Sequence, residues 1–131
     1  MAQGRRVAST GMDLGALREL LLELPDAEEY EHGGQPAFRV RGKARFATML
    51  DDEGINLFPG EAGILAYTQA RPDVCAERWW GKRLAAVRVD YRHAERALIE
   101  EIVFESYAAR APRRLVEQVE RERVRRRDVE R

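Results

Sequence analysis

The sequence predicts an α+β domain, a compact α/β sandwich in which an antiparallel sheet packs against N- and C-terminal helices. Apolar residues recur three and four positions apart near both ends of the chain, whereas the middle alternates apolar and polar residues. The expected strands are grouped between helices, which favours an antiparallel sheet over βαβ repeats. A chain of 131 residues, 44% of them hydrophobic, has the size and composition of one folded domain.

The first expected element is an amphipathic helix that starts after Asp13 and ends at Pro25. An aspartate at this position can accept hydrogen bonds from the free N–H groups of the first turn, and proline ends the helix. Leucines at helical spacing supply the apolar face: Leu14, Leu17, Leu20, Leu21 and Leu24. Residues 1–11 are small and polar, and we expect them to be disordered.

The middle of the chain predicts strands. Phe38 and Val40 alternate with Arg39 and Arg41, as in a strand with one buried face. Before it we expect an extended acidic segment around Tyr30 and a turn over 33–36. The later expected elements are strands over 44–50 and 55–58, a short helix over 61–70, and a hairpin over 75–80 and 84–90.

Two helices are expected at the C-terminal end. A long helix starts near Arg92, and a final helix starts at Pro112, a residue that suits the first turn of a helix. Beyond Glu120 the sequence is almost entirely charged, and we expect it to fray. One domain is therefore expected over 12–120, followed by a charged tail over 121–131.

Several classes of protein are excluded or disfavoured by composition. Apolar runs are far shorter than the roughly 20 residues that cross a bilayer, so no membrane partner is expected. The single cysteine, Cys75, cannot form an intramolecular disulfide, and the first residues lack the apolar stretch of a secretory signal. Together these features predict a cytoplasmic protein.

Residues suited to catalysis or metal binding are few. Cys75 would need a histidine beside it to act as a nucleophile, and no motif links it to His32 or His93. The sequence has neither the paired Cys and His spacings of zinc sites nor a glycine-rich phosphate loop. We therefore expect no enzymatic activity, no catalytic residues, no metal and no cofactor.

The charges are balanced overall but unevenly distributed. The formal net charge is zero, yet residues 13–31 carry seven acids against one base, and residues 37–50 carry four bases and no acid. Two expected hairpin tips share a Gly-Lys pair, Gly42–Lys43 and Gly81–Lys82. We expect the basic residues near both tips to form one continuous patch that contacts phosphates. The candidate nucleic-acid-binding residues are Arg39, Arg41, Lys43, Arg45, Lys82 and Arg83.

Two neighbouring tryptophans add to this hypothesis and also open an alternative. Trp79 and Trp80 can offer an aromatic surface on which nucleic-acid bases stack. The charge pattern by itself favours a solvated outer sheet face, with one tryptophan in the core and the other half-exposed. A further alternative is a protein-interaction module that uses the exposed sheet face or Trp79 and Trp80 and that could form a homodimer.

The order of several short motifs resembles the MmcQ/YjbR family. Residues 24–29 (LPDAEE) and 35–43 (QPAFRVRGK) look like the family patterns LPG-x-E-E and PAF-x-V-x-GK. Residues 87–90 and 107–115 resemble its closing strand and its "APK-x-L" end, so the match covers about 13–118. The resemblance implies a CyaY-like or double-wing fold and DNA binding, with the two Gly-Lys hairpins as the wings. Asp26 departs from the family pattern, which commonly has glycine there.

Overall fold

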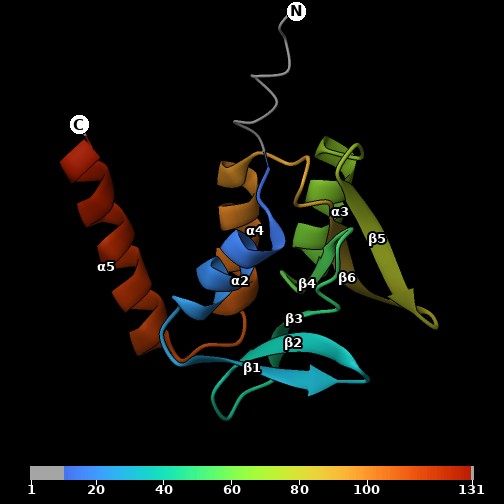
Figure 1. Cartoon of the computed structure of the whole chain (residues 1–131), viewed down its shortest axis with the longest axis horizontal. Coiled ribbons are helices and arrows are strands. Elements are labelled where there is room, and N and C mark those ends of the chain that lie inside the picture. The colour runs from blue at the N-terminus through green and yellow to red at the C-terminus, as the bar shows by residue number, and fades with distance from the viewer. Residues whose placement is uncertain (1–10, 131) are drawn as a thin grey trace, which may run out of the picture.

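The computed structural model describes residues 11–130 and shows a six-stranded sheet with helices against one of its faces (Figure 1). Every neighbouring pair of strands is antiparallel, in the order β1-β2-β3-β4-β6-β5. The α+β class predicted from the sequence is confirmed. The elements in chain order are α2 (Leu14–Leu22), β1 (Ala27–His32), β2 (Gln35–Val40), β3 (Arg45–Thr48), β4 (Ile55–Leu57), α3 (Glu61–Ala70), β5 (Cys75–Trp80), β6 (Arg83–Val89), α4 (Arg96–Ala108) and α5 (Arg113–Glu130). The disorder expected for residues 1–11 lies outside the described residues, except for Gly11.

The acidic segment forms a full strand, β1, which pairs with β2 from Ala27 opposite Val40 to His32 opposite Gln35. The turn between them is therefore only Gly33 and Gly34, shorter than the turn expected over 33–36. Both glycines have positive φ, 61° and 82°, which side chains disfavour. Glutamates are poor strand formers in general, but charged residues are common on an edge strand because they discourage pairing with other chains.

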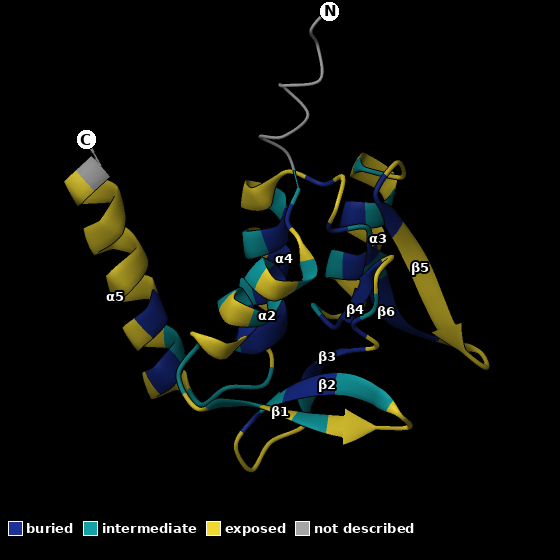
Figure 2. Ribbon diagram, in the orientation of Figure 1, coloured by how far each residue is buried: buried dark blue, intermediate teal, exposed yellow. Residues whose placement is uncertain are grey.

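The core lies between the helices and the inner face of the sheet (Figure 2). At its centre the rings of Phe46 on β3 and Tyr107 on α4 meet edge to face, with centroids 5.7 Å apart. The Tyr107 hydroxyl donates a 2.8 Å hydrogen bond to the carbonyl oxygen of Pro25, just after α2. This contact joins the N-terminal helix to the C-terminal half of the domain. The inner sheet face contributes Phe38, Val40, Leu57, Val87 and Val89, all fully buried or nearly so.

Both C-terminal helices differ from their expected bounds. Helix α4 begins at Arg96 instead of near Arg92, because the N–H groups of His93 and Ala94 bond to the Asp90 carbonyl in a separate turn. Helix α5 continues to Glu130, so the fraying expected beyond Glu120 is not observed. Arginine and glutamate have good helix propensity, and opposite charges one turn apart support the helix.

A polar contact fixes the β3–β4 connection on the outer face. Asp51 Oδ1 accepts hydrogen bonds from the backbone N–H groups of Glu53 and Gly54, at 2.8 and 3.0 Å. It also accepts one from Arg88 Nη2 at 2.6 Å, while Arg88 Nη1 donates to the Met49 carbonyl at 2.8 Å. Burial raises the pKa of Asp51, but these donors together bring the pKa below its ordinary value. The end of β3 is thereby held against β6.

None of the helices within residues 11–130 combines the length and the apolar character that crossing a bilayer requires.

The Tyr107 hydrogen bond gives a test of the packing. Tyr107→Phe keeps the ring but leaves the Pro25 carbonyl without its donor, so we expect unfolding free energy to fall by about 1–2 kcal/mol. Urea denaturation followed by circular dichroism measures the change. Tyr30→Phe is the matched control, since its hydroxyl has no hydrogen bond within the described part of the chain and should cost little. Equal effects of the two substitutions would contradict the assigned role of Tyr107.

Candidate nucleic-acid interface

Two of the six predicted basic residues, Arg39 and Arg41, lie next to the acidic strand. Arg39 Nε is 2.8 Å from Glu28 Oε2, and the two residues are direct partners in the β1–β2 register. Arg41 Nε lies 3.9 Å from the other oxygen of the same carboxylate. The Arg39 guanidinium also sits 4.2 Å from the centre of the Tyr30 ring. Their charge is thus largely balanced within the β1–β2 hairpin.

Two other predicted residues, Arg45 and Arg83, meet at Trp80. The guanidinium carbon of Arg83 is 5.2 Å from the centre of the Trp80 ring, and that of Arg45 is 5.9 Å away. Both distances fall within the range of cation–π attraction. The Phe58 ring lies 5.8 Å from the Trp80 ring, so residues from three strands and a loop converge here. We call Arg45, Phe58, Trp80 and Arg83 the Trp80 cluster.

Arg110, which the sequence analysis did not single out, extends the Trp80 cluster. Its Nε donates a 3.0 Å hydrogen bond to the Arg45 carbonyl, and its guanidinium lies 5.8 Å from the Phe58 ring. Arg110 follows α4, 65 positions from Arg45 in the sequence. No local pattern could have joined them, because only the packing of α4 against β3 brings them together.

The two lysines, Lys43 and Lys82, are exposed at separate hairpin tips. Figure 1 shows the β2–β3 turn and the β5–β6 turn at opposite sides of the lower part of the molecule. The continuous patch expected from the sequence is therefore not formed. Neighbouring strands are rotated by about 20–25° each, and over six strands this twist turns the two hairpins in different directions.

Arg45, Lys82 and Arg83 bring positive charge to the Trp80 end of the sheet, and a second cationic region lies where Arg96 of α4 meets Arg123, Arg126 and Arg127 of α5. The ion pairs found within residues 11–130 do not include Arg45, Lys82 or Arg83. Both tryptophans are also accessible there, Trp79 being 53% and Trp80 39% exposed, so neither lies in the core as the alternative interpretation expected. This end of the sheet offers cations and aromatic rings side by side.

A cavity of about 370 Å³ opens beside Trp80, between the β1–β2 turn and β3. Thr48 lines it and is 3% exposed, and its hydroxyl has no hydrogen-bond partner within residues 11–130. The buried Nε of Arg45 also lacks a partner in this part of the chain. Two unpartnered polar atoms at one cavity are unusual, because buried polar groups are nearly always hydrogen-bonded. The lining residues are His32, Gly33, Gln35, Arg45, Thr48, Met49 and Trp80, with no carboxylate among them.

The backbone at Met49, on the same cavity wall, has a φ of 54°. This left-handed conformation is strained for a residue with a side chain, and such strain tends to occur at functional sites. Met49 is held there by the hydrogen bond from Arg88 to its carbonyl oxygen. Its side chain is 44% exposed and gives the cavity an apolar edge beside Trp80.

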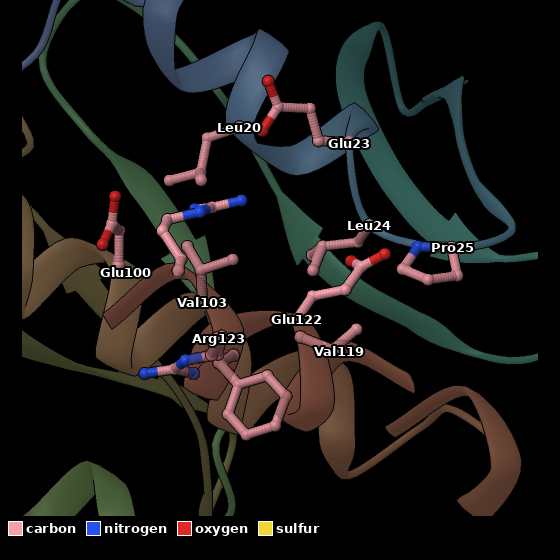
Figure 3. Close-up of a pocket in the computed structure, with 11 residues that line it drawn as sticks. Leu20, Glu23, Leu24, Pro25, Glu100, Val103, Val119, Glu122 and Arg123 are labelled. Carbon is pink, nitrogen blue, oxygen red and sulfur yellow. The ribbon is translucent and has the colours of Figure 1, made fainter. Parts of the chain in front are cut away.

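A second concavity, between α2, α4 and α5, suits nucleic acid poorly (Figure 3). Its volume is about 100 Å³, and Leu20, Leu24 and Val119 supply apolar walls. Glu23, Glu100 and Glu122 lie around it together with Arg123 and Arg126, so its rim carries mixed charge and no continuous basic surface. This groove is the seam along which α5 packs on the domain.

A further polar group, the hydroxyl of Tyr67, has a structural role. The Tyr67 hydroxyl on α3 lies 2.8 Å from Glu101 Oε2 and 2.6 Å from Glu105 Oε2 on α4. Burial and these carboxylates raise the pKa of Tyr67 far above its ordinary value, so the phenol keeps its proton and links the two helices.

Within residues 11–130 no three His, Cys, Asp or Glu side chains gather as metal ligands.

Comparison with known proteins supports the fold. No protein-family model matches the sequence, and no curated protein matches it. Among solved structures, the Deinococcus radiodurans protein DR2400, which carries a DUF419 domain, has a similar fold with a TM-score of 0.63. The two are 21% identical, and the match covers 76% of this chain and 79% of that one. The chain therefore has a fold similar to that of a DUF419 domain.

The unpartnered Thr48 hydroxyl predicts an effect on stability. Thr48→Val replaces the hydroxyl with a methyl group of similar size, which removes a buried polar atom without a partner. We expect the unfolding free energy to rise by about 1 kcal/mol. Thr48→Ser keeps the hydroxyl, loses a methyl group, and should lower it by about 1 kcal/mol. Thermal and urea denaturation measure both, and a destabilised Thr48→Val would show that the hydroxyl is well bonded.

The environment of Cys75 predicts an unreactive thiol. Burial raises its pKa to about 11, against a smaller opposing effect of Arg71, and the residue is 3% exposed. At pH 8 a colorimetric disulfide reagent should modify Cys75 at least about a hundredfold more slowly in the native protein than in denaturant. Fast stoichiometric labelling of the native protein would be evidence for an accessible, activated cysteine.

Proposed function

We propose that the protein is a DNA-binding protein of the MmcQ/YjbR type and that the β5–β6 hairpin provides its main contacts. The supporting observation is the Trp80 cluster, where Arg45 and Arg83 flank an exposed indole without a carboxylate partner. The order of the sequence motifs, which resembles the MmcQ/YjbR family, points in the same direction. The fold similarity to a DUF419 domain fits the architecture of this proposal. We propose a binding function without catalysis.

The chemistry of this surface suits a nucleic acid. Guanidinium and ammonium groups contact phosphates, and each neutralised phosphate releases counterions, which favours binding. Exposed aromatic rings beside arginines are typical of surfaces on which bases stack. Lys82 and Arg83 stand at the tip and at the first residue of β6, so both can reach a phosphate backbone that passes over Trp80.

The six predicted residues contribute unequally in this proposal. Lys82, Arg83 and Arg45 form the main surface, while Lys43 gives a separate contact at the other hairpin tip. Arg39 and Arg41 contribute least, because Glu28 already balances their charge. With a net charge of zero, attraction acts mainly within about 10 Å of the cluster, the screening length at moderate salt.

Strand β5 favours a second candidate function, protein interaction. It is the last strand of the sheet, and residues Ala76–Trp80 are all exposed. An edge strand with free backbone groups can pair with a strand from another chain, including a second copy of this one. Trp79, 53% exposed, would then be the anchor of a homodimer or of a complex with a protein partner.

Charge reversal at the hairpin tests the first proposal. The double variant Lys82→Glu/Arg83→Glu should weaken DNA binding at least about tenfold, because two phosphate contacts become repulsive. For the unaltered protein, log affinity should fall with log salt concentration with a slope of about −3, from three or four contacts. Fluorescence anisotropy with labelled duplex and single-stranded DNA measures both quantities.

The matched control is Arg121→Glu/Arg125→Glu, which makes the same change in net charge on the exposed part of α5. It should leave binding nearly unchanged, and an equal loss would contradict a specific site at the hairpin. Absence of any DNA binding would overturn the proposal. A concentration-dependent dimer seen by light scattering and abolished by Trp79→Glu would then favour the edge-strand function.

A further inference from the structure

We propose that the cavity beside Trp80 holds one nucleotide unit, a base with its phosphate, so that the protein prefers single strands over duplexes. This inference rests on the proposed nucleic-acid function and specifies its ligand. It assigns a role to the β1–β2 turn and to the end of β3, which the phosphate contacts of the hairpins do not use.

The strongest support comes from the two unpartnered polar atoms. Arg45 Nε is a donor, and the Thr48 hydroxyl can both donate and accept. Both residues line the same cavity, and both atoms are buried behind its surface without a partner within residues 11–130. The edge of a base carries ring nitrogens, carbonyl oxygens and amino groups in fixed positions. A base entering the cavity would supply the missing partners for both atoms once the covering side chains adjust.

The rest of the lining fits a planar, anionic ligand. Trp80 and Met49 give apolar contact, whereas Gln35, His32 and the Gly33 backbone can donate hydrogen bonds. Because no carboxylate lines the cavity, a phosphate is not repelled there. The volume of about 370 Å³ lies in the range of small-ligand sites, about 300–1,000 Å³.

Access to the cavity explains the expected preference for single strands. A base in a duplex is stacked and paired, and its edge cannot enter a cavity between a turn and an indole. A base in a single strand is free to leave the stack at low cost and can be read on its edge. The neighbouring phosphate would then lie near Arg83, whose guanidinium is beside Trp80. A free nucleoside monophosphate offers the same chemistry.

The experiment compares four probes by anisotropy and calorimetry. These are a single-stranded oligonucleotide, a strand of the same length with abasic sites throughout, a duplex, and nucleoside monophosphates. Thr48→Val exchanges the hydroxyl for a methyl group, and Thr68→Val on α3 makes the same exchange at a residue outside the cavity lining. Circular dichroism confirms that both variants are folded.

The proposal predicts tighter binding of the base-bearing strand than of the abasic strand or the duplex. Thr48→Val should weaken binding of the base-bearing strand roughly fivefold and leave the abasic strand and the duplex unchanged. Thr68→Val should change none of them. Equal effects of Thr48→Val on all probes, or no effect on any, would overturn the inference.

The outcomes also separate this inference from the proposed function. If the duplex binds and is weakened by Lys82→Glu/Arg83→Glu while Thr48→Val has no effect, the inference fails and the proposed function stands. If only nucleoside monophosphates bind and Thr48→Val weakens them, the cavity takes free nucleotides and the proposed function fails. If no probe binds, both are overturned.

Discussion

The packing of α3 and α4 against one face of the sheet is the constraint on which the other features depend. Phe46 and Tyr107 lie at the centre of this layer, and the Tyr107 hydroxyl ties the end of α2 to it. Since the helices occupy the inner face, the outer face carries the polar alternation of the strands. Thr48 and Asn56 are buried polar residues that lie opposite each other in the β3–β4 register. The Trp80 cluster lies where Arg110, just after α4, reaches Arg45 and Phe58, and the cavity opens beside it.

The twist of the strands determines the positions of the basic residues on the surface. The chain has equal numbers of acidic and basic residues, and the fold places them on different parts of the surface. Strand β1, at the edge of the sheet, brings Glu28 next to Arg39 and Arg41, so this carboxylate balances much of the charge of the two arginines. The same twist carries the β5–β6 hairpin away from β2 and toward Arg45, where Trp80 meets two guanidinium groups. A protein without net charge thus keeps a small, unbalanced cationic surface.

Periodicity predicted most of the fold, because burial of alternate residues leaves a direct mark on the sequence. The leucines of α2 and the alternation around Phe38 identified their elements, and the glycine turns identified the hairpins. The sequence predicts only an extended segment where β1 lies, because its glutamates carry no apolar alternation that would mark a paired strand. The start of α4 was misplaced because Tyr91 and Ala94 are buried in a turn that resembles the helix in composition. For the candidate site, the residue types predicted the basic hairpins. Three other features depend on contacts between segments that are distant in the sequence: the pairing of Arg39 with Glu28, the contribution of Arg110, and the unpartnered hydroxyl of Thr48. A threonine on a strand carries no local signal of this kind.

The most direct test of the account is an NMR titration of the ¹⁵N-labelled protein with a short single-stranded oligonucleotide. The side-chain N–H signals of Arg45 Nε and Trp80 Nε1 report on the cluster itself. The account predicts that these two signals and the backbone amides of residues 80–83 shift together and saturate at one equivalent, while those of residues 121–129 stay in place. Shifts confined to α5, or to the β1–β2 hairpin around Glu28, would contradict it.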